Sequence, residues 1–485
     1  MAIDRLSALD EAFLRLDSRA TPMHVGWTLL ADGDPPAVEA LREHVAGRLH
    51  LLPRFRRRPL TSALRLHDPV WVDDPEFDIE HQIARATVED PGGPAELRAL
   101  AGRLLSLPLD RRHPLWRLWL IDGLRDVRFA VVGQAHHALV DGMAAIEVAQ
   151  LLLDADPDVK AARPRPWSAS PEPSLAERAL ATVSDRARVG RAAGSLALKA
   201  LVNPGVAGEG VEALRRLGSA LEPVAGAAPR TALNRRIGPG RSVAFAELPL
   251  AAAKELGREH GATVNDVVLA TAALALGRYL RRAGEHHPWL RTLVPVSTRP
   301  DGTHAELGNR VSFVMVELPI GERSPGAALE EVTRQMRQHK SAGSAGAFDG
   351  LLHAARFAPL AVRDAIAWIA TRPQTFNLVV SNLPGPSDTL YVMGRPLRAA
   401  YPAVPLPRGQ SLSVGMLSYR DVLHVGLYAN PDVLPDVVDV ARDFTRSFDA
   451  LRFALAPRPP EPGAPAPAPL DRERARRHRR ERVFA

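Results

Sequence analysis

The stretch GQAHHALVDGMAA (residues 133–145) places two adjacent histidines three apolar residues ahead of an Asp-Gly pair. This pattern fits three kinds of site: a catalytic site, a metal site, or a pair of buried histidines whose hydrogen bonds are made inside a core. The preceding apolar residues are typical of a β-strand, in which alternate side chains share a face. His137 then lies on the face of Gly133 and Ala135, and His136 points the opposite way.

This alternation disfavours the metal site, because neighbouring strand residues do not converge on one ion and no third ligand follows at zinc-like spacing. Gly133 and Ala135 carry the smallest side chains, so we expect open space beside the His137 imidazole that admits a substrate. A neutral imidazole accepts a proton near neutral pH, as a general base must. His137 is therefore predicted to be that base, with a buried structural histidine as the alternative.

The Asp-Gly pair falls where the predicted strand gives way to a helix. Three roles are open to Asp141, which can cap that helix, pair with an arginine or orient His137. Gly142 allows the backbone to pass closely through the turn.

The bulk composition narrows the class of protein. A chain of 485 residues favours two large domains, and 46% hydrophobic with 24% charged residues is typical of a folded protein. Because cysteine is absent, disulfides, thiolate metal sites and cysteine nucleophiles are excluded. We expect a cytoplasmic protein without a signal peptide or membrane span. Nucleic-acid binding is not expected, since aromatic residues are only 5% and the net charge of +7 is diffuse.

Strand and helix signals alternate in two parts of the chain and predict an α/β fold. Strand-like runs start at His24 and Arg128, and a late hairpin is predicted to turn near Arg420. Residues 1–158, which hold the histidine motif, and residues 231–456 are interpreted as two domains. The Ala-, Arg- and Pro-rich crossover at 159–230 contains two basic amphipathic helices, expected to pack on the protein itself, with a membrane surface as the alternative. The Pro- and Arg-rich tail at 457–485 is predicted to be disordered, or to contact an anionic membrane loosely.

The pattern HHxxxDG resembles the active-site signature of the CoA-dependent acyltransferase superfamily, which includes chloramphenicol acetyltransferases and peptide-synthetase condensation domains. Further stretches narrow the resemblance to bacterial wax ester synthase/diacylglycerol acyltransferases, from about residue 6 to residue 450. These stretches are LSALDEAFLRLDSRATPMHVG near the start, HPLW at 113–116, LNRRIGPGR from 233, VND at 264–266, PVSTR ending at 299, GNRVSF from 308 and NLVVSNLPGP from 377.

The resemblance implies two chloramphenicol-acetyltransferase-like domains, joined by the helical crossover, with an active-site channel at their interface. Acyl-CoA, a substrate and not a cofactor, would meet diacylglycerol or a long-chain alcohol at His137. The implied reaction is long-chain O-acyl transfer, with triacylglycerol favoured over wax ester as product. Amide formation of the condensation type and catalytically silent binding to a lipid surface are the alternatives. Peripheral attachment to the inner membrane face or to lipid inclusions is also implied.

The resemblance also assigns site residues. His136, His137, Asp141 and Asn265 form the catalytic set, in which Asp141 holds the motif loop through an arginine. Asn265, near the start of a helix capped by Thr263, would donate to the developing oxyanion, with an ordinary polar residue as the alternative. Substrate contacts are assigned to Gly133, Ala135, Gly142, Ser381 and Asn382, although a strand-end turn also explains the last two. Structural roles are assigned to Pro114, Leu115, Trp116, Asp266 and Arg299, the last as the partner of Asp141. No metal site is expected.

Overall fold

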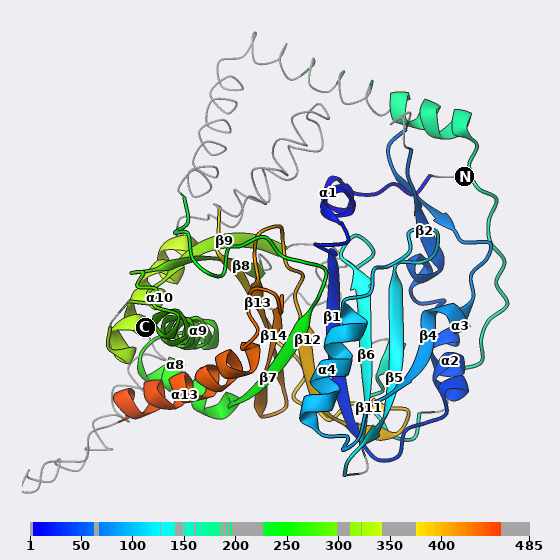
Figure 1. The fold of residues 1–485 in the computed structure, drawn as a ribbon. Helices are drawn as coiled ribbons and strands as arrows, with labels where there is room; N and C mark the ends of the chain where they lie inside the picture. The colour runs from blue at the N-terminus through cyan, green and yellow to red at the C-terminus, as the bar shows by residue number, and fades with distance from the viewer. Residues whose placement is uncertain are drawn as a thin grey trace, which may run out of the picture.

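Two β-sheets stand side by side and divide the molecule into two halves (Figure 1). The computed structural model describes residues 3–62, 67–126, 128–140, 149, 151–159, 162–184, 187, 191, 195, 227–297, 311–321, 323–341 and 375–456. Three residues singled out in the sequence, Asp141, Gly142 and Arg299, lie outside this part of the chain, as does the tail at 457–485. Among the described residues, each of the two sheets has six strands.

The first half is built on the sheet with strand order β11-β12-β1-β6-β5-β4. Strands β1 and β6 pair antiparallel at its centre, β4 pairs parallel with β5, and β2 and β3 form a separate ribbon. The elements that precede the crossover are α1 (Ala8–Leu16), β1 (His24–Asp32), α2 (Val38–Ala46), the 3₁₀ helix η1 (Pro53–Arg56), β2 (Arg57–Leu60), β3 (Val70–Asp73), α3 (Ile79–Gln82), β4 (Ile83–Thr87), α4 (Pro94–Leu105), β5 (Trp116–Leu124) and β6 (Arg128–His136).

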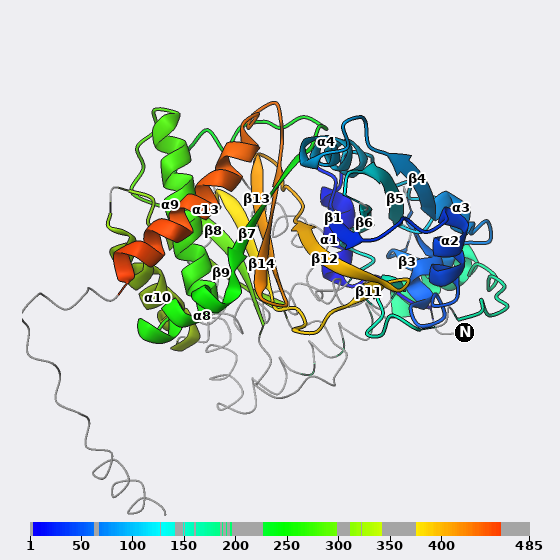
Figure 2. The same cartoon turned by 90° about the horizontal axis from the view of Figure 1, so that it is seen from below.

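The second half is built on the sheet with strand order β7-β14-β13-β10-β8-β9. Helices α8, α9, α10 and α13 gather on one face of this sheet, as Figure 2 shows, and bury a large apolar core there. The elements after the crossover are β7 (Ser242–Pro249), α8 (Leu250–Glu259), α9 (Val264–Arg282), β8 (Leu290–Ser297), β9 (Val311–Leu318), α10 (Pro325–Ser341), β10 (Leu378–Leu383), β11 (Tyr391–Val392), β12 (Arg395–Ala403), β13 (Leu412–Tyr419), β14 (Val422–Ala429) and α13 (Val437–Leu455).

Two strands from the predicted second domain (residues 231–456), β11 and β12, belong to the first sheet. These strands belong to the C-terminal part of the chain, yet β12 pairs antiparallel with β1 and extends the first sheet. At its end, Pro402 packs on Gly415 and Gly426, which lie opposite each other on β13 and β14. A Cβ atom on Gly426 would lie 2.0 Å from the Pro402 carbonyl oxygen, so glycine is required for this approach. The two halves are therefore interlocked.

Most elements expected from local patterns are confirmed. The β-branched run from His24 forms β1, and the run from Arg128 forms β6. The hairpin expected near Arg420 joins β13 to β14, and Arg420 takes a left-handed φ of 54° in its turn. The fold is thus α/β with two sheets, as predicted.

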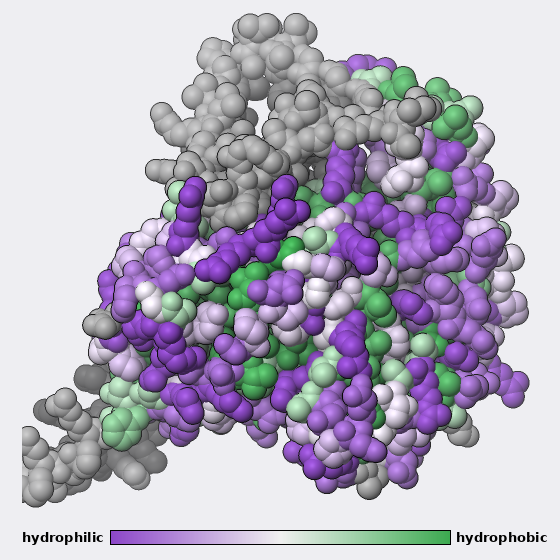
Figure 3. Space-filling view, in the orientation of Figure 1, coloured by the Kyte–Doolittle hydropathy of each residue, from purple (hydrophilic) through white to green (hydrophobic). Residues whose placement is uncertain are grey.

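The described part of the crossover runs along the first half. Glu172 pairs with Arg58 at 3.0 Å, and the Thr182 hydroxyl accepts from the Asp68 backbone N–H at 3.0 Å. The described start of the first crossover helix therefore packs on the first half, whereas most of that helix and the whole second predicted helix lie outside the described residues. Leu180 and Val183 on the described helix at 175–184 nevertheless remain 71% and 62% exposed. Apolar residues are visible as green atoms at the upper right of Figure 3, where this helix lies. The described chain contains no helix long and apolar enough to cross a bilayer.

Candidate functional site

The histidine pair lies at the end of β6, held through its backbone from both neighbouring strands. The His136 N–H donates to the Leu115 carbonyl and the His137 N–H to the Met23 carbonyl, both at 2.8 Å. The chain then turns, because the Leu139 N–H donates back to the His136 carbonyl at 2.8 Å. His137 is thus the first residue beyond a strand that is anchored on both sides.

The side chains of β6 alternate as predicted. Phe129 and Val131 belong to one apolar cluster, and Ala130 and Val132 to another on the opposite face. The half-buried His137 imidazole lies parallel to the Phe13 ring of α1, with ring centroids 4.0 Å apart and an interplanar angle of 16°. A helix from the start of the chain therefore covers one face of the predicted base.

His136 has a different environment. Its side chain is 2% exposed, and its Nδ1 accepts from the Ala138 N–H at 3.0 Å. Burial, reinforced by the nearby His24 and Arg111, holds the pKa of His136 well below its usual value, so the ring is neutral at pH 7. The geometry gives His136 a structural role, because its ring and its carbonyl accept hydrogen bonds from the turn that follows His137. A direct catalytic part for His136 stays a prediction.

Gly133 leaves no open volume, so the expectation that this glycine clears space beside the His137 imidazole is wrong. Gly133 lies directly opposite Trp27 of β1, and a Cβ atom on Gly133 would lie 2.4 Å from the Trp27 indole. The ring fills the volume that the missing side chain leaves. Ala135, the next residue toward His137 on this face, is fully buried and lies opposite Trp116 of β5. Glycine is needed at 133 to admit the indole.

The PLW stretch is buried beside the histidine pair. Pro114, Leu115 and Trp116 are buried, and the Trp116 indole N–H donates to the Phe55 carbonyl at 2.8 Å. Since the Leu115 carbonyl accepts from the His136 N–H, this stretch fixes one side of the histidine pair.

Asp17 is a site residue that the sequence did not single out. Its carboxylate accepts from the Met23 N–H at 2.9 Å and from the Arg111 guanidinium at 2.9 Å. Arg111 also donates to the Leu14 carbonyl at 2.6 Å, at the end of α1. Asp17 therefore fixes the loop at 18–23, whose Met23 carbonyl holds His137. No local pattern pairs Asp17 with Arg111, which follows 94 residues later.

The site is also tied to the second half through β1. His24 lies opposite His136, and its Nε2 is 2.8 Å from the Leu105 carbonyl, which the Tyr428 hydroxyl of β14 also contacts at 2.9 Å. Burial lowers the pKa of His24 to about 4, so this ring is neutral at pH 7. A hydrogen-bonded node between the halves therefore adjoins the histidine pair.

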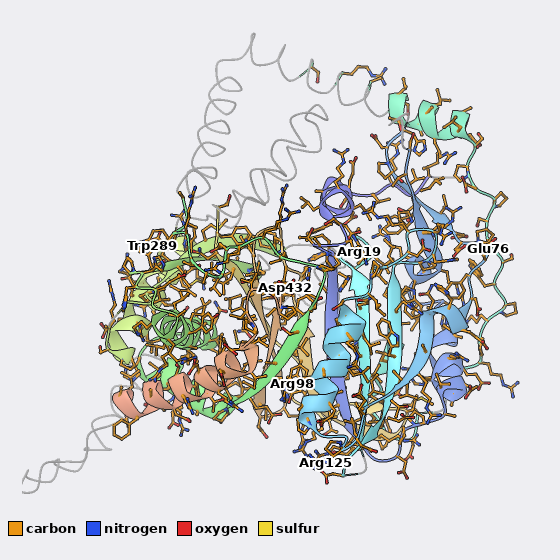
Figure 4. The ribbon with its side chains drawn as sticks, in the orientation of Figure 1. Arg19, Glu76, Arg98, Arg125, Trp289 and Asp432 are labelled. Carbon is orange, nitrogen blue, oxygen red and sulfur yellow. The ribbon has the colours of Figure 1, made fainter. Side chains whose placement is uncertain are left out.

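A second link reaches the loop at 18–23 itself. The buried Arg241 guanidinium donates to the Ala20 carbonyl at 2.6 Å, and its backbone N–H donates to the Ser106 hydroxyl at 2.9 Å. Figure 4 shows Arg19 of the same loop at the boundary between the halves, with Asp432 across it. The loop that holds His137 thus lies where the two halves meet.

The remaining predicted residues lie on other elements of the second half. Asn265 is half-buried in the first turn of α9, which starts with the expected cap: the Asp266 carboxylate accepts from the Thr263 N–H at 2.8 Å. Ser381 and Asn382 are half-buried near the end of β10. The structure shows Asp266 in this cap. The roles of Asn265, Ser381 and Asn382 stay predictions. Nowhere in the described residues do three or more His, Asp or Glu side chains gather as a metal site would need.

Comparison with known proteins adds two matches to family models. Residues 6–268 match the wax ester synthase/diacylglycerol acyltransferase catalytic domain, and residues 307–452 match the WS/DGAT C-terminal domain. "Probable diacyglycerol O-acyltransferase tgs1" of Mycobacterium tuberculosis H37Rv is 30% identical over 453 residues, 91% of this chain and 94% of that protein. "Probable diacyglycerol O-acyltransferase tgs2" of the same strain is 32% identical over 439 residues, which are 88% of this chain and 93% of that protein.

Solved structures give the same picture. The wax ester synthase/diacylglycerol acyltransferase from Marinobacter aquaeolei VT8 superposes with a TM-score of 0.65 at 26% identity, covering 93% of this chain and 99% of that one. The first condensation domain of the CDA synthetase superposes with a TM-score of 0.55 at 18% identity, over 93% and 96%. The latter likeness shows the shared fold.

Proposed function

The chain belongs to the wax ester synthase/diacylglycerol acyltransferase family, and from that premise we propose that it transfers a long-chain acyl group from acyl-CoA to a lipid hydroxyl, with His137 as general base. The observation that carries the proposal is the placement of His137, anchored by backbone at the end of β6, half-buried and beside the boundary between the halves. Diacylglycerol is the favoured acceptor because the relatives are named for it; a fatty alcohol comes second.

The proposed reaction is a direct transfer. The His137 imidazole takes the proton of the acceptor hydroxyl as that oxygen attacks the thioester carbonyl carbon. The tetrahedral intermediate collapses with cleavage of the carbon–sulfur bond, and the imidazolium returns its proton to the CoA thiolate. An ester and free CoA leave, and no acyl-enzyme forms.

Two further roles belong to this proposal. Asn265, beside the N-terminus of α9, donates from its amide to the oxyanion of the intermediate, where the helix dipole also favours negative charge. Asp141 holds the motif loop through Arg299, so that neither residue handles the transferred proton. Ser381 and Asn382 at the end of β10 contact the acyl group.

Peripheral attachment to a membrane or lipid inclusion also stays part of the proposal. The exposed Leu180 and Val183 on the crossover helix support it, since apolar side chains at such positions partition into a lipid surface.

The test is ester formation from labelled palmitoyl-CoA with diacylglycerol, hexadecanol or a long-chain amine, using the full chain, His137→Ala and His260→Ala. His260 is an exposed histidine at the end of α8 and serves as the matched control. We expect ester from the wild type and His260→Ala, and at least a hundredfold loss in His137→Ala. Undiminished ester formation by His137→Ala would contradict the mechanism. Amide as the main product would favour condensation chemistry, and no product with any acceptor would favour a silent lipid binder.

A further inference from the structure

Phe13 is an apolar residue of α1 whose ring lies on the predicted base. We infer that Phe13 is a positioning residue for His137, which fixes the plane of the imidazole and favours the charged ring formed when the acceptor hydroxyl loses its proton. This inference rests on the proposed function for its catalytic consequence. The contact itself is independent of that function.

The geometry of the contact suits a charged partner. The two rings are nearly parallel, at 16°, with centroids 4.0 Å apart, so the Phe13 face is turned toward the imidazole. The face of an aromatic ring carries the negative end of its quadrupole and attracts a cation. The attraction is therefore stronger for imidazolium than for neutral imidazole. Because the base becomes protonated during proton transfer, this interaction is stronger in the transition state than in the ground state. It therefore lowers the activation barrier of the transfer and does not merely strengthen substrate binding.

Helix α1 is held firmly enough to keep Phe13 in place. Its start carries a reciprocal cap, in which Asp10 accepts from the Ser7 N–H and the Ser7 hydroxyl accepts from the Asp10 N–H, both at 3.1 Å. At its end, Arg111 donates to the Leu14 carbonyl at 2.6 Å, and the Leu14 side chain is buried in the core. Both ends of this short helix are thus tied down around Phe13.

The same segment also holds the His137 backbone. Asp17, directly after α1, accepts from the Met23 N–H, and the Met23 carbonyl accepts from the His137 N–H at 2.8 Å. The ring of His137 is therefore fixed by Phe13 and its backbone by Met23. Both contacts come from one continuous segment, which places the imidazole in advance of substrate binding.

The neighbouring His136 lies against the charged or titratable groups of His24, Asp17 and Arg111. None of them changes when Phe13 is replaced by another uncharged residue. A change in the titration of His137 in such a variant therefore reports loss of the aromatic face rather than a change of charge.

The test compares Phe13→Leu, which removes the aromatic face, with Phe13→Tyr, which retains it. The His137 ring signal is followed by NMR as the pH is varied, in full-length protein labelled at histidine and assigned with His137→Gln. In Phe13→Leu we expect the titration midpoint to fall by about 0.4 to 1.5 pH units, and kcat to fall about 3- to 30-fold with a smaller change in KM. In Phe13→Tyr we expect both to stay close to wild type.

Three results separate the outcomes. An unchanged midpoint in a folded Phe13→Leu variant overturns the inference, whatever the activity. Should that variant fail to fold, the wild-type spectrum decides: the Phe13 ring current is expected to move the His137 ring protons upfield, and their absence from that region overturns the contact. Should the wild type form no ester while the midpoint shifts as expected, the proposed function fails and the contact stands.

Discussion

The surroundings of His137 and the start of α9, which carries Asn265, are assembled in different ways. His137 is held by Phe13 and Met23, more than a hundred residues earlier in the chain. Asn265 stands in a turn closed by its neighbours Thr263 and Asp266. The first arrangement depends on tertiary contacts and the second on local sequence. Changes in the residues that hold His137 should therefore alter catalysis together with stability, whereas changes at the cap of α9 should have small and local effects.

Among the residues that hold the base, the largest effect is expected from Asp17→Ala, which removes the acceptor for the Met23 N–H and the partner of Arg111. We expect kcat to fall at least about tenfold and the free energy of unfolding to fall by about 1–3 kcal/mol. Urea denaturation and ester formation measure the two. Asp17→Asn, which keeps one acceptor oxygen, is the matched control and should lose less. Wild-type kcat in a folded Asp17→Ala protein would show that the loop at 18–23 does not position the base.

Gly133→Ala tests the close packing of Trp27 against β6. The added Cβ atom would lie 2.4 Å from the indole, so the ring must shift. Overpacking of this kind costs about 1–3 kcal/mol, measured as a lower free energy of unfolding. A combined Trp27→Phe, Gly133→Ala protein should recover part of that loss. If Gly133→Ala alone is as stable as wild type, the indole does not fill this space in solution.

His24 predicts a pH dependence of stability. The pKa of His24 is about 4 in the folded protein, against an ordinary value of 6.5. As the pH falls below 6.5, His24 therefore takes up a proton in the unfolded chain, whereas in the folded chain it stays neutral down to about pH 4. Stability is therefore complete above pH 6.5 and is lost as the pH falls toward 4. Between pH 7.5 and 5.5 we expect a loss of about 1 kcal/mol in urea denaturation, which His24→Gln should reduce. An identical pH dependence in both proteins would count against a neutral, buried His24.

The smallest effect is expected from Thr263→Ala at the start of α9. Loss of the hydroxyl that accepts from the Asp266 N–H removes the cap and costs about 1 kcal/mol of unfolding free energy. Since the change is local, kcat should fall less than in Asp17→Ala. Thr263→Ser restores the hydroxyl and should restore stability. A larger loss of kcat in Thr263→Ala than in Asp17→Ala would reverse the comparison between the two regions.

The features that the sequence predicted correctly are those that depend on local sequence and not on tertiary contacts. The strands at His24 and Arg128 and the cap at Thr263 depend on neighbouring residues, and local patterns predicted them correctly. The placement of Trp27 against Gly133 depends on how β1 and β6 are aligned, which alternation within one strand does not reveal.

No local sequence pattern predicted the contacts that join distant parts of the chain. The pairing of β12 with β1 and the ion pair of Asp17 with Arg111 join residues far apart in sequence. Periodicity describes the face of an element and not its partner. The candidate base could therefore be named from the motif, while the residues that hold it could not.

The most direct test of the account is to exchange the two histidines separately and measure kcat and melting temperature in each variant. His137→Gln should melt within a few degrees of wild type and lose at least about a hundredfold in kcat. His136→Gln should lose stability, because it replaces a buried ring whose Nδ1 accepts from the Ala138 N–H. A folded His137→Gln protein with more than a tenth of wild-type kcat would contradict the assignment of His137 as the base.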